Sequence, residues 1–265
     1  MQELVINSKD CEIHYWLREG SSEKYLIFLH GVALDHTIFA KQFPAMLEDY
    51  NLIALDVRAH GKSILESSKR FYYNDIINDI VAICNKHNIK SAVFIGHSMG
   101  GYLSQNIAIN FPDLARGIIL ISSMNSSKQE GIADKIQVKI ADFIYKLAPE
   151  KMIKYLFGIF SNGNKSTKQY IRQRFDTFGK YRFVQVMSSV ANYLYLGFDV
   201  SISCPKLVIL GEKDRTGHLG KMRRQWKNDS TTTKILISDA GHNPNQDKPD
   251  EVNVTIIDFL KKIDE

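Results

Sequence analysis

Ser98, which lies between glycines in the stretch "GHSMGG", is the residue of this sequence best placed to act as a nucleophile. It follows an apolar run typical of a buried strand and precedes a pattern typical of a helix. On such a turn a Gly-x-Ser-x-Gly sequence exposes the serine hydroxyl, and the glycines let strand and helix approach each other. The Gly-x-Ser-x-Gly pattern alone occurs by chance in about one in ten random chains of this length. Its position between a predicted strand and a predicted helix is therefore the stronger evidence for a nucleophile. The N–H of Met99, at the start of the helix, is then predicted to bind a developing oxyanion.

A serine hydroxyl becomes a good nucleophile only when a base, usually a histidine oriented by a carboxylate, removes its proton. On this architecture the acid is expected after the serine, and the histidine after the acid. Asp214 follows the strand pattern "KLVILG", and His242 follows "TKILIS". Because the carboxyl ends of parallel strands meet at one edge of a sheet, Ser98, Asp214 and His242 are predicted to form a catalytic triad.

Other acids and histidines lie near these positions in the sequence. Asp239, three residues before His242, and Glu212, in the same loop as Asp214, are rival candidates for the acid. We interpret His218 as a surface histidine, since it lies on the loop or helix after Asp214. His97 is interpreted as a packing or hydrogen-bonding residue beside the nucleophile and as a candidate substrate contact.

The loop after the strand pattern "KYLIFLH" is predicted to provide a second oxyanion donor. This loop reads "LHGVALDHTIF". Gly31 permits a sharp turn, and the N–H of Val32 is the candidate that would act together with Met99. His30 is interpreted as a residue that braces the loop.

These residues need a parallel sheet to bring them together, and the hydrophobic pattern predicts one. Strands are predicted at residues 3–7 and 11–17 (a hairpin), 24–30, 51–56, 91–96, 115–122, 206–211 and 233–238, and helical patterns at 36–50, 72–88, 98–112, 217–228 and 249–263. Alternating strands and helices indicate an α/β protein, a mostly parallel eight-stranded sheet with helices on both faces. Residues 124–200 contain no convincing strand and are predicted to be a helical cap inserted after the sixth strand. The core then consists of residues 1–123 and 201–265.

Charge and composition narrow the classes of function. The 265 residues are 44% hydrophobic and carry a net charge of +5. Residues 124–200 contain 12 lysines and arginines and six aspartates and glutamates. This excess of positive charge indicates either a solvated helical face or a surface attracted to anionic substrates or membranes. The basic run at 221–227, "KMRRQWK", is explained by a solvated helix, so no nucleic-acid partner is expected.

Several further absences are expected from the sequence. The three cysteines have neither disulfide nor zinc spacing, and no metal site, cofactor or nucleotide fingerprint is predicted. No apolar run approaches the roughly 18 residues that a membrane span needs, and the start of the sequence does not read as a signal peptide. A cytoplasmic monomer or homodimer is the expectation.

Five segments together resemble the α/β-hydrolase-fold serine hydrolases, the group of esterases, lactonases and cofactor-free haloperoxidases. They are "LHGVALDHTIF", "DVRAHGKS", "GHSMGGYLS", "LVILGEKD" and "GHNPNQDKPDEVNVTIIDFL", in the order and spacing of that family. Two positions depart from it: Ala59 stands where related proteins often have glycine, and Phe39 where many have tryptophan. The first is expected to affect a loop near the site, and Phe39 is expected to form part of the wall of the substrate pocket.

The resemblance implies acyl transfer to water. Family members that open epoxides or remove halides use an aspartate at the nucleophile position, so Ser98 favours a carboxylesterase, thioesterase or lactonase. The aromatic residues of the segment 124–200 favour an apolar acyl or ring moiety in a small-molecule ester substrate. Three alternatives remain open: a perhydrolase of the cofactor-free haloperoxidase type, a lyase on the same triad, and a hydrolase-like small-molecule receptor.

Overall fold

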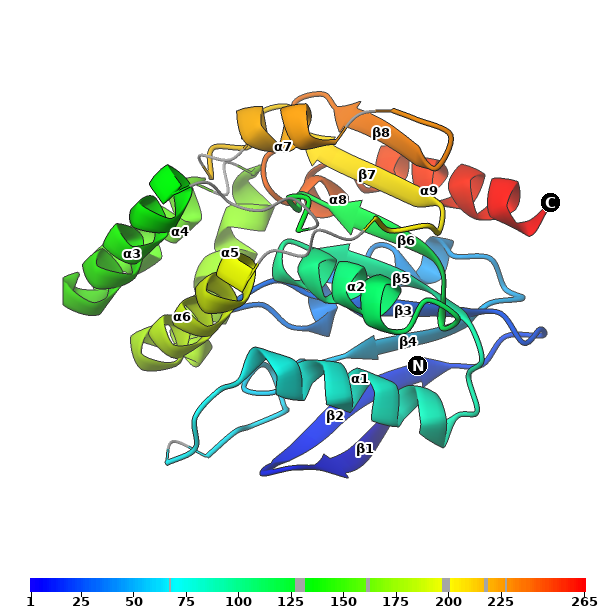
Figure 1. Cartoon of the computed structure of the whole chain (residues 1–265), viewed down its shortest axis with the longest axis horizontal. Coiled ribbons are helices and arrows are strands. Elements are labelled where there is room, and N and C mark those ends of the chain that lie inside the picture. Colours follow the sequence, from blue (N-terminus) through cyan, green and yellow to red (C-terminus); the bar gives the residue numbers. More distant parts are fainter. Residues whose placement is uncertain (67, 127–131, 161–162, 197–200, 217–218, 227) are drawn as a thin grey trace.

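A single eight-stranded sheet organises the chain in the computed structural model (Figure 1), which describes all residues except 67, 127–131, 161–162, 197–200, 217–218 and 227. The strand order is β1-β2-β4-β3-β5-β6-β7-β8. The strands are β1 (Gln2–Ser8), β2 (Cys11–Arg18), β3 (Tyr25–Leu29), β4 (Asn51–Leu55), β5 (Ala92–His97), β6 (Ala115–Ile121), β7 (Lys206–Gly211) and β8 (Thr232–Ile237). Strand β2 pairs antiparallel with β1 and β4, and every other neighbouring pair is parallel. The mostly parallel eight-stranded sheet predicted from the sequence is confirmed.

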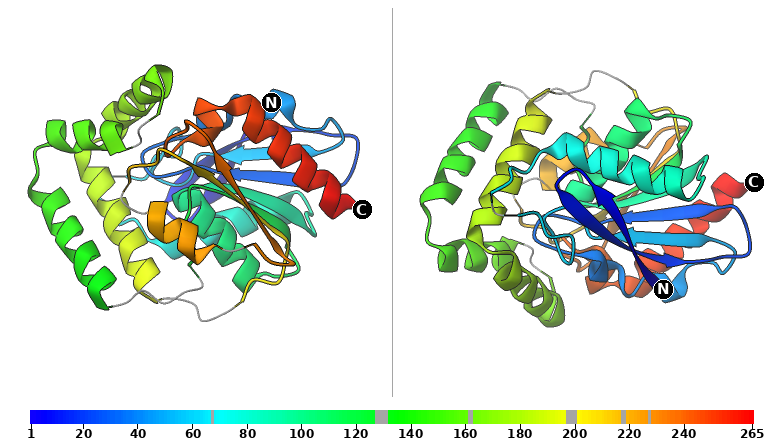
Figure 2. Two further views of the ribbon diagram at one scale, coloured as in Figure 1. Left: turned by 90° about the horizontal axis from the view of Figure 1, so that it is seen from above. Right: turned by 90° about the horizontal axis from the view of Figure 1, so that it is seen from below.

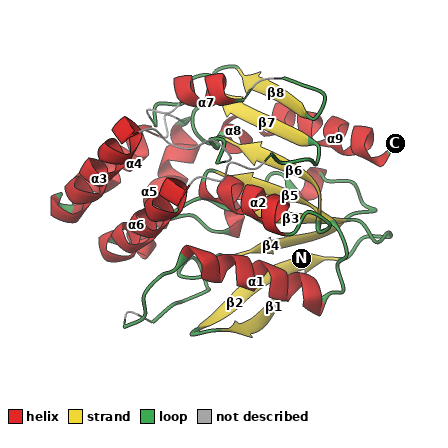
Figure 3. Ribbon diagram, viewed as in Figure 1, coloured by secondary structure: helices red, strands yellow, loops and turns green. Residues whose placement is uncertain are grey.

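Both faces of the sheet are covered by helices, as Figure 3 shows. In the central strand β3, Ile27 and Leu29 face one hydrophobic cluster and Leu26 and Phe28 face the other, since successive side chains of a strand alternate. The helices outside the segment between β6 and β7 are α1 (Tyr73–Lys86), α2 (Met99–Asn110), α7 (Leu219–Gln225), α8 (Pro244–Asp247) and α9 (Pro249–Asp264). Helices α1, α2 and α7 pack on the first cluster, and α9 packs on the second.

The segment 36–50 differs from the expected helix. It forms two short 3-10 helices, η1 (His36–Phe39) and η2 (Phe43–Ala45). Pro44 lacks an N–H and its ring would clash with the preceding turn of an α-helix, so an α-helix cannot continue through it. The apolar residues at helical spacing are nevertheless buried, because Ile38 and Phe39 pack under β3.

The described residues between β6 and β7 form four helices: α3 (Ile132–Leu147), α4 (Glu150–Phe160), α5 (Lys165–Phe178) and α6 (Lys180–Leu196). They lie together at one side of the sheet (Figures 1 and 2), and we refer to them as the helical insertion. Helix α6 contacts the core where the Tyr73 N–H donates to Ser189 Oγ (3.0 Å) and Arg182 Nη2 donates to the Leu65 carbonyl (2.6 Å). Helix α5 contacts the loops that follow β3 and β8, as described below.

Within the part of the chain that the structure describes, no helix is long and apolar enough to cross a membrane.

Candidate active site

Ser98 occupies the turn between β5 and α2 in a strained conformation. Its φ is 51° and its ψ is −112°, outside the regions that a residue with a Cβ adopts readily. The flanking glycines are needed for steric reasons: a Cβ at Gly96 would lie 2.2 Å from the Gly100 carbonyl oxygen, and one at Gly100 would lie 1.8 Å from the Leu29 carbonyl oxygen. The strand and helix are therefore packed so closely that the turn between them is sharp and Ser98 lies at its apex.

His242 and Asp214 are hydrogen-bonded to each other. The His242 Nδ1 lies 2.7 Å from Asp214 Oδ2, which leaves the His242 Nε2 available for another partner. The other carboxylate oxygen of Asp214 accepts bonds from the Thr216 N–H (2.9 Å) and hydroxyl (2.7 Å). Burial would raise the pKa of the Asp214 carboxyl, but the charge and hydrogen bond of His242 and the bonds from Thr216 together lower it to about 2. Asp214 is thus held as a carboxylate that orients the imidazole ring.

The two rival acids point elsewhere. Asp239 is exposed and forms an ion pair with Lys213 at 2.6 Å. Glu212 is also exposed, and its carboxylate accepts the Asp239 N–H at 3.3 Å. Neither contacts His242, so the geometry supports Asp214 as its partner. His218 lies outside the described residues.

The Gly31 loop lies directly against the Ser98 turn. A Cβ at Gly31 would lie 2.7 Å from His97 Nδ1 and 3.3 Å from Ser98 Cβ. The next residue, Val32, has an N–H without an acceptor among the described residues. The N–H of Met99 is the first of α2 and has no acceptor within the helix. Among the described residues, the N–H groups of Val32, next to Gly31, and of Met99, next to Ser98, therefore have no acceptor.

The structure brings His242 beside the Ser98 turn, although the Ser98 hydroxyl forms no hydrogen bond with His242 or with any other described residue. The link is His97, whose Nε2 lies 2.9 Å from the His242 carbonyl oxygen. The rings of His97 and His242 are 5.1 Å apart between centroids. Ser98 and His242 are therefore neighbours, joined through the main chain and the residue before the serine.

His97 and Phe39 are not placed as substrate contacts. The His97 side chain is only 1% exposed, and burial together with the charge of His242 lowers its pKa to about 3. Phe39 is fully buried and packs on Phe28, with 5.2 Å between ring centroids, in the second hydrophobic cluster, the one that contains Leu26 and Phe28 of β3. The expectation that Phe39 forms part of the pocket wall is therefore wrong, because its side chain fills the core.

His30 braces the loops around the site. Its Nδ1 lies 2.8 Å from the Gly31 carbonyl oxygen, and its Nε2 accepts the Val57 N–H at 2.9 Å. The ring thus joins the loop after β3 to the loop after β4. Burial lowers the pKa of His30, and the neutral ring with its proton on Nδ1 satisfies both bonds.

Sequence reasoning missed two carboxylates that attach helix α5 to these loops. Asp35, four residues after Gly31, pairs with Arg174 at 2.6 Å and accepts the Tyr170 hydroxyl at 3.2 Å. Asp247, five residues after His242, accepts the Thr167 hydroxyl at 2.7 Å on one oxygen. Its other oxygen accepts the N–H of Gly241 at 2.9 Å. Both acids lie in segments that resemble the α/β-hydrolase-fold serine hydrolases. That resemblance was the only feature of the sequence that could have drawn attention to them.

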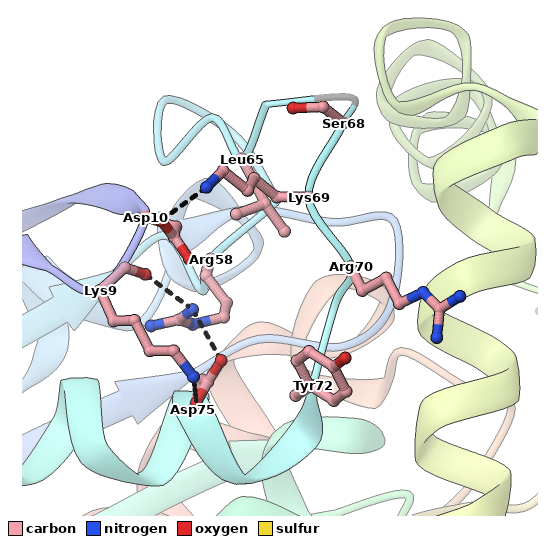
Figure 4. Close-up of a pocket in the computed structure, with 9 residues that line it drawn as sticks. All are labelled: Lys9, Asp10, Arg58, Leu65, Ser68, Lys69, Arg70, Tyr72 and Asp75. Carbon is pink, nitrogen blue, oxygen red and sulfur yellow. Dashed lines mark hydrogen bonds and ion pairs between the residues drawn. The ribbon is translucent and has the colours of Figure 1, made fainter.

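A separate cavity of about 220 Å³ lies away from Ser98 (Figure 4), lined by Lys9, Asp10, Arg58, Leu65, Ser68, Lys69, Arg70, Tyr72 and Asp75. Its buried cation, Arg58, is already paired with Asp79 at 2.6 Å and with Asp75 at 3.3 Å. Lys69 pairs with Asp10 at 2.9 Å. Since these charges neutralise one another, the cluster holds the start of α1 against the turn between β1 and β2.

Ala59, beside this cluster, adopts a φ of 68°. This is the left-handed region, which glycine enters freely and alanine does not. The chain thus keeps the conformation that suits the glycine of related proteins, at a cost in strain.

No group of three or more histidine, cysteine, aspartate or glutamate side chains arranged to hold a metal ion is found among the described residues.

The sheet order, the strained serine turn and the acid–histidine pair after β7 and β8 define the architecture of an α/β hydrolase. A family model described as the alpha/beta hydrolase fold matches residues 24–143. The chain therefore has the α/β-hydrolase fold.

Three individual proteins illustrate the similarity. The uncharacterized hydrolase YugF of Bacillus subtilis is 23% identical over 261 residues, which cover 94% of each chain. A thermophilic esterase from Thermogutta terrifontis superimposes with a TM-score of 0.79 at 22% identity and 99% coverage of both chains. The enol-lactonase from Burkholderia xenovorans gives a TM-score of 0.77 at 17% identity, covering 97% of this chain and all of the other. The two structural likenesses show the fold.

Proposed function

We propose that this hydrolase cleaves carboxylic esters, thioesters or lactones through an acyl-enzyme formed on Ser98. The observation that carries the proposal is the 2.7 Å bond between His242 Nδ1 and Asp214 Oδ2 beside the strained Ser98 turn. An esterase and an enol-lactonase among the structural neighbours are consistent with this bond class.

In the proposed mechanism His242 Nε2 takes the proton of the Ser98 hydroxyl as the serine oxygen attacks the substrate carbonyl carbon. Asp214, ionised down to about pH 2, stabilises the imidazolium that results. The N–H groups of Val32 and Met99 donate to the oxyanion of the tetrahedral intermediate. His242 then protonates the leaving group, and water activated by the same histidine releases the acid. The missing Ser98–His242 hydrogen bond is compatible with this scheme, since such bonds often tighten only when substrate binds.

The segment 124–200 acts in this proposal as a cap over the core formed by residues 1–123 and 201–265. Helix α5 supports this reading because it contacts the loop after β3 through Asp35 and the loop after β8 through Asp247. Aromatic side chains of the helical insertion would then favour an apolar acyl or ring moiety. A small-molecule ester is the expected substrate, and the chemistry needs no cofactor.

The test is initial-rate hydrolysis of p-nitrophenyl esters of increasing acyl length, with thioester and lactone substrates assayed in parallel. Ser98→Ala should reduce kcat by several orders of magnitude. Ser104→Ala is the matched control, because Ser104 is a buried serine of helix α2, which follows the Ser98 turn, and its hydroxyl donates to the Gly100 carbonyl at 3.0 Å. This variant should keep most of the activity.

A fluorophosphonate probe provides a second readout, since it should label Ser98 and leave Ser98→Ala unlabelled. A folded wild-type protein that hydrolyses none of these substrates, or a Ser98→Ala variant as active as wild type, would refute the proposal. Labelling of Ser98 after a single turnover, with tight retention of the product, would indicate a receptor instead.

A further inference from the structure

Helix α3 exposes a continuous row of large apolar side chains. Ile136, Ile140, Phe143, Ile144 and Leu147 are between 47% and 68% exposed. Their spacing of four, seven, eight and eleven residues from Ile136 places them on one face of the helix. We call these five residues the α3 stripe.

The stripe is not the face by which α3 packs on the protein. Tyr145, on the opposite face, packs edge-on against Phe183 of α6 with 5.4 Å between ring centroids. The residues that follow, Ala148 and Ile153, are buried in the same hydrophobic cluster. Both views of Figure 2 show α3 at the outer edge of the molecule, with α6 between it and the core. The α3 stripe therefore faces away from the rest of the described chain.

Neighbouring helices extend this surface. Met152 and Tyr155 of α4 are 42% and 59% exposed, and Tyr181 at the start of α6 is 61% exposed. Tyr181 belongs to the same region because Lys180 Nζ donates to the Lys146 carbonyl at 2.9 Å. With about 100 Å² exposed by each of the eight side chains, the apolar area is on the order of 800 Å², above the 300–600 Å² that is typical of the largest patch on a monomer.

Lysines flank the apolar residues. Lys139, Lys146 and Lys151 are exposed along α3 and at the start of α4. Lys146 is paired with Asp142 at 2.5 Å, whereas Lys139 and Lys151 have no ion pair among the described residues. The whole segment 124–200 carries six more basic than acidic residues. An apolar face bordered by lysines is the pattern of a helix that lies in the interface of a negatively charged bilayer.

The charge distinguishes between two occupants of this surface. A second copy of the chain in a two-fold dimer would bring this net-positive surface against itself, and the two surfaces would repel each other. Anionic lipid headgroups would instead pair with them, at a gain for each lysine near the surface. We propose that the α3 stripe docks on the surface of an anionic lipid bilayer, with its apolar side chains at the level of the headgroups and acyl chain ends.

The test is flotation with vesicles of phosphatidylcholine, with and without phosphatidylglycerol. Wild-type protein should float with the anionic vesicles, and binding should weaken as salt is added. The double variant Ile140→Asp/Phe143→Asp should bind at least about tenfold more weakly. Val254→Asp is the matched control: Val254 is 58% exposed on α9, outside the stripe, and its replacement should leave binding unchanged.

A second double variant, Ile140→Ser/Phe143→Ser, separates lost apolar contact from added charge and should also bind less well. Circular dichroism and thermal melting check that each variant is folded. Equal binding of wild type and the Asp variant, or no preference for the anionic vesicles, would overturn the proposal. So would sedimentation showing a wild-type dimer that the Asp variant converts to monomer, since a second copy would then cover the stripe. These readouts do not depend on ester hydrolysis.

Discussion

The backbone strain at Ser98 predicts that removing its Cβ stabilises the protein. With φ at 51° and ψ at −112°, a residue with a side chain carries a strain of about 1–3 kcal/mol. Ser98→Ala removes the hydroxyl but keeps the Cβ and therefore the strain. Ser98→Gly relieves the strain and so stabilises the folded state. Glycine also gives the unfolded chain more conformational entropy, which offsets about 0.5–1 kcal/mol of this stabilisation. Taking about 2 kcal/mol of strain, we expect Ser98→Gly to be about 1 kcal/mol more stable than Ser98→Ala.

Urea unfolding measures this difference, with the fluorescence of Trp16 and Trp226 as the signal and pH and salt held constant. The comparison of Gly with Ala at one position cancels the loss of the hydroxyl, which is common to both variants. Ser104 provides the control pair because it lies within helix α2, where glycine is about 1 kcal/mol less favourable than alanine. The difference between the Gly and Ala variants should therefore have the opposite sign at position 104.

A Ser98→Gly variant that is no more stable than Ser98→Ala would refute the reasoning, because the turn would then store no strain that the side chain causes. If the prediction holds, both variants should lack esterase activity while one of them is more stable. Stability would then be given up at this turn to position the hydroxyl.

Three further predictions concern the same region. Asp214→Asn should lower kcat for p-nitrophenyl esters by about 10⁴ with a small change in KM, since His242 would lose the carboxylate that fixes its tautomer; activity within tenfold of wild type would contradict the role of Asp214. Ala59→Gly should raise the free energy of unfolding by about 0.5–1 kcal/mol in urea titrations, because φ is 68° there and alanine is strained in that region; unchanged or lower stability would show that the loop adapts to alanine. Burial, with the charge of a neighbouring histidine, lowers the pKa of His60 and of His97 to about 3 in the folded protein. Their contribution to stability should therefore be constant above about pH 7.5 and fall by about 2 kcal/mol per histidine at pH 5, where only the unfolded chain takes up these protons. The loss between pH 7.5 and pH 5 should be smaller by about that amount in His60→Asn, and an equal loss would count against the assignment.

The strands and their order of appearance could be predicted from the sequence because each is a short apolar run ended by a turn residue. The run before Gly31 and the run before Ser98 became β3 and β5, neighbours in the sheet. Which strands lie next to each other in the sheet could not be predicted from the hydrophobic pattern, because that pattern describes each strand separately. The helix expected at 36–50 failed because its apolar spacing was counted without the effect of Pro44 on the preceding turn.

The residues proposed as the triad could be predicted because topology alone constrains them. Asp214 and His242 each follow a parallel strand, so their loops meet at one edge of the sheet whatever the details of packing. Whether Phe39 and His97 contact the substrate could not be predicted this way. Both side chains are near the site in sequence, but which direction a side chain takes depends on the conformation of the turn, and both are buried.

Helix α5 shows most clearly what sequence could not provide. Asp35 and Arg174 are 139 residues apart, and Thr167 and Asp247 are 80 residues apart, so no local pattern connects them. Asp35 is only 4% exposed; loss of Arg174 would leave its charge buried with neutral partners only, which is more costly than the loss of a surface ion pair. Because Asp35 follows the Val32 loop and Asp247 holds the residue before His242, one helix is bonded to both loops that flank Ser98. A displacement of α5 would therefore act on the candidate oxyanion donor and on the candidate base together.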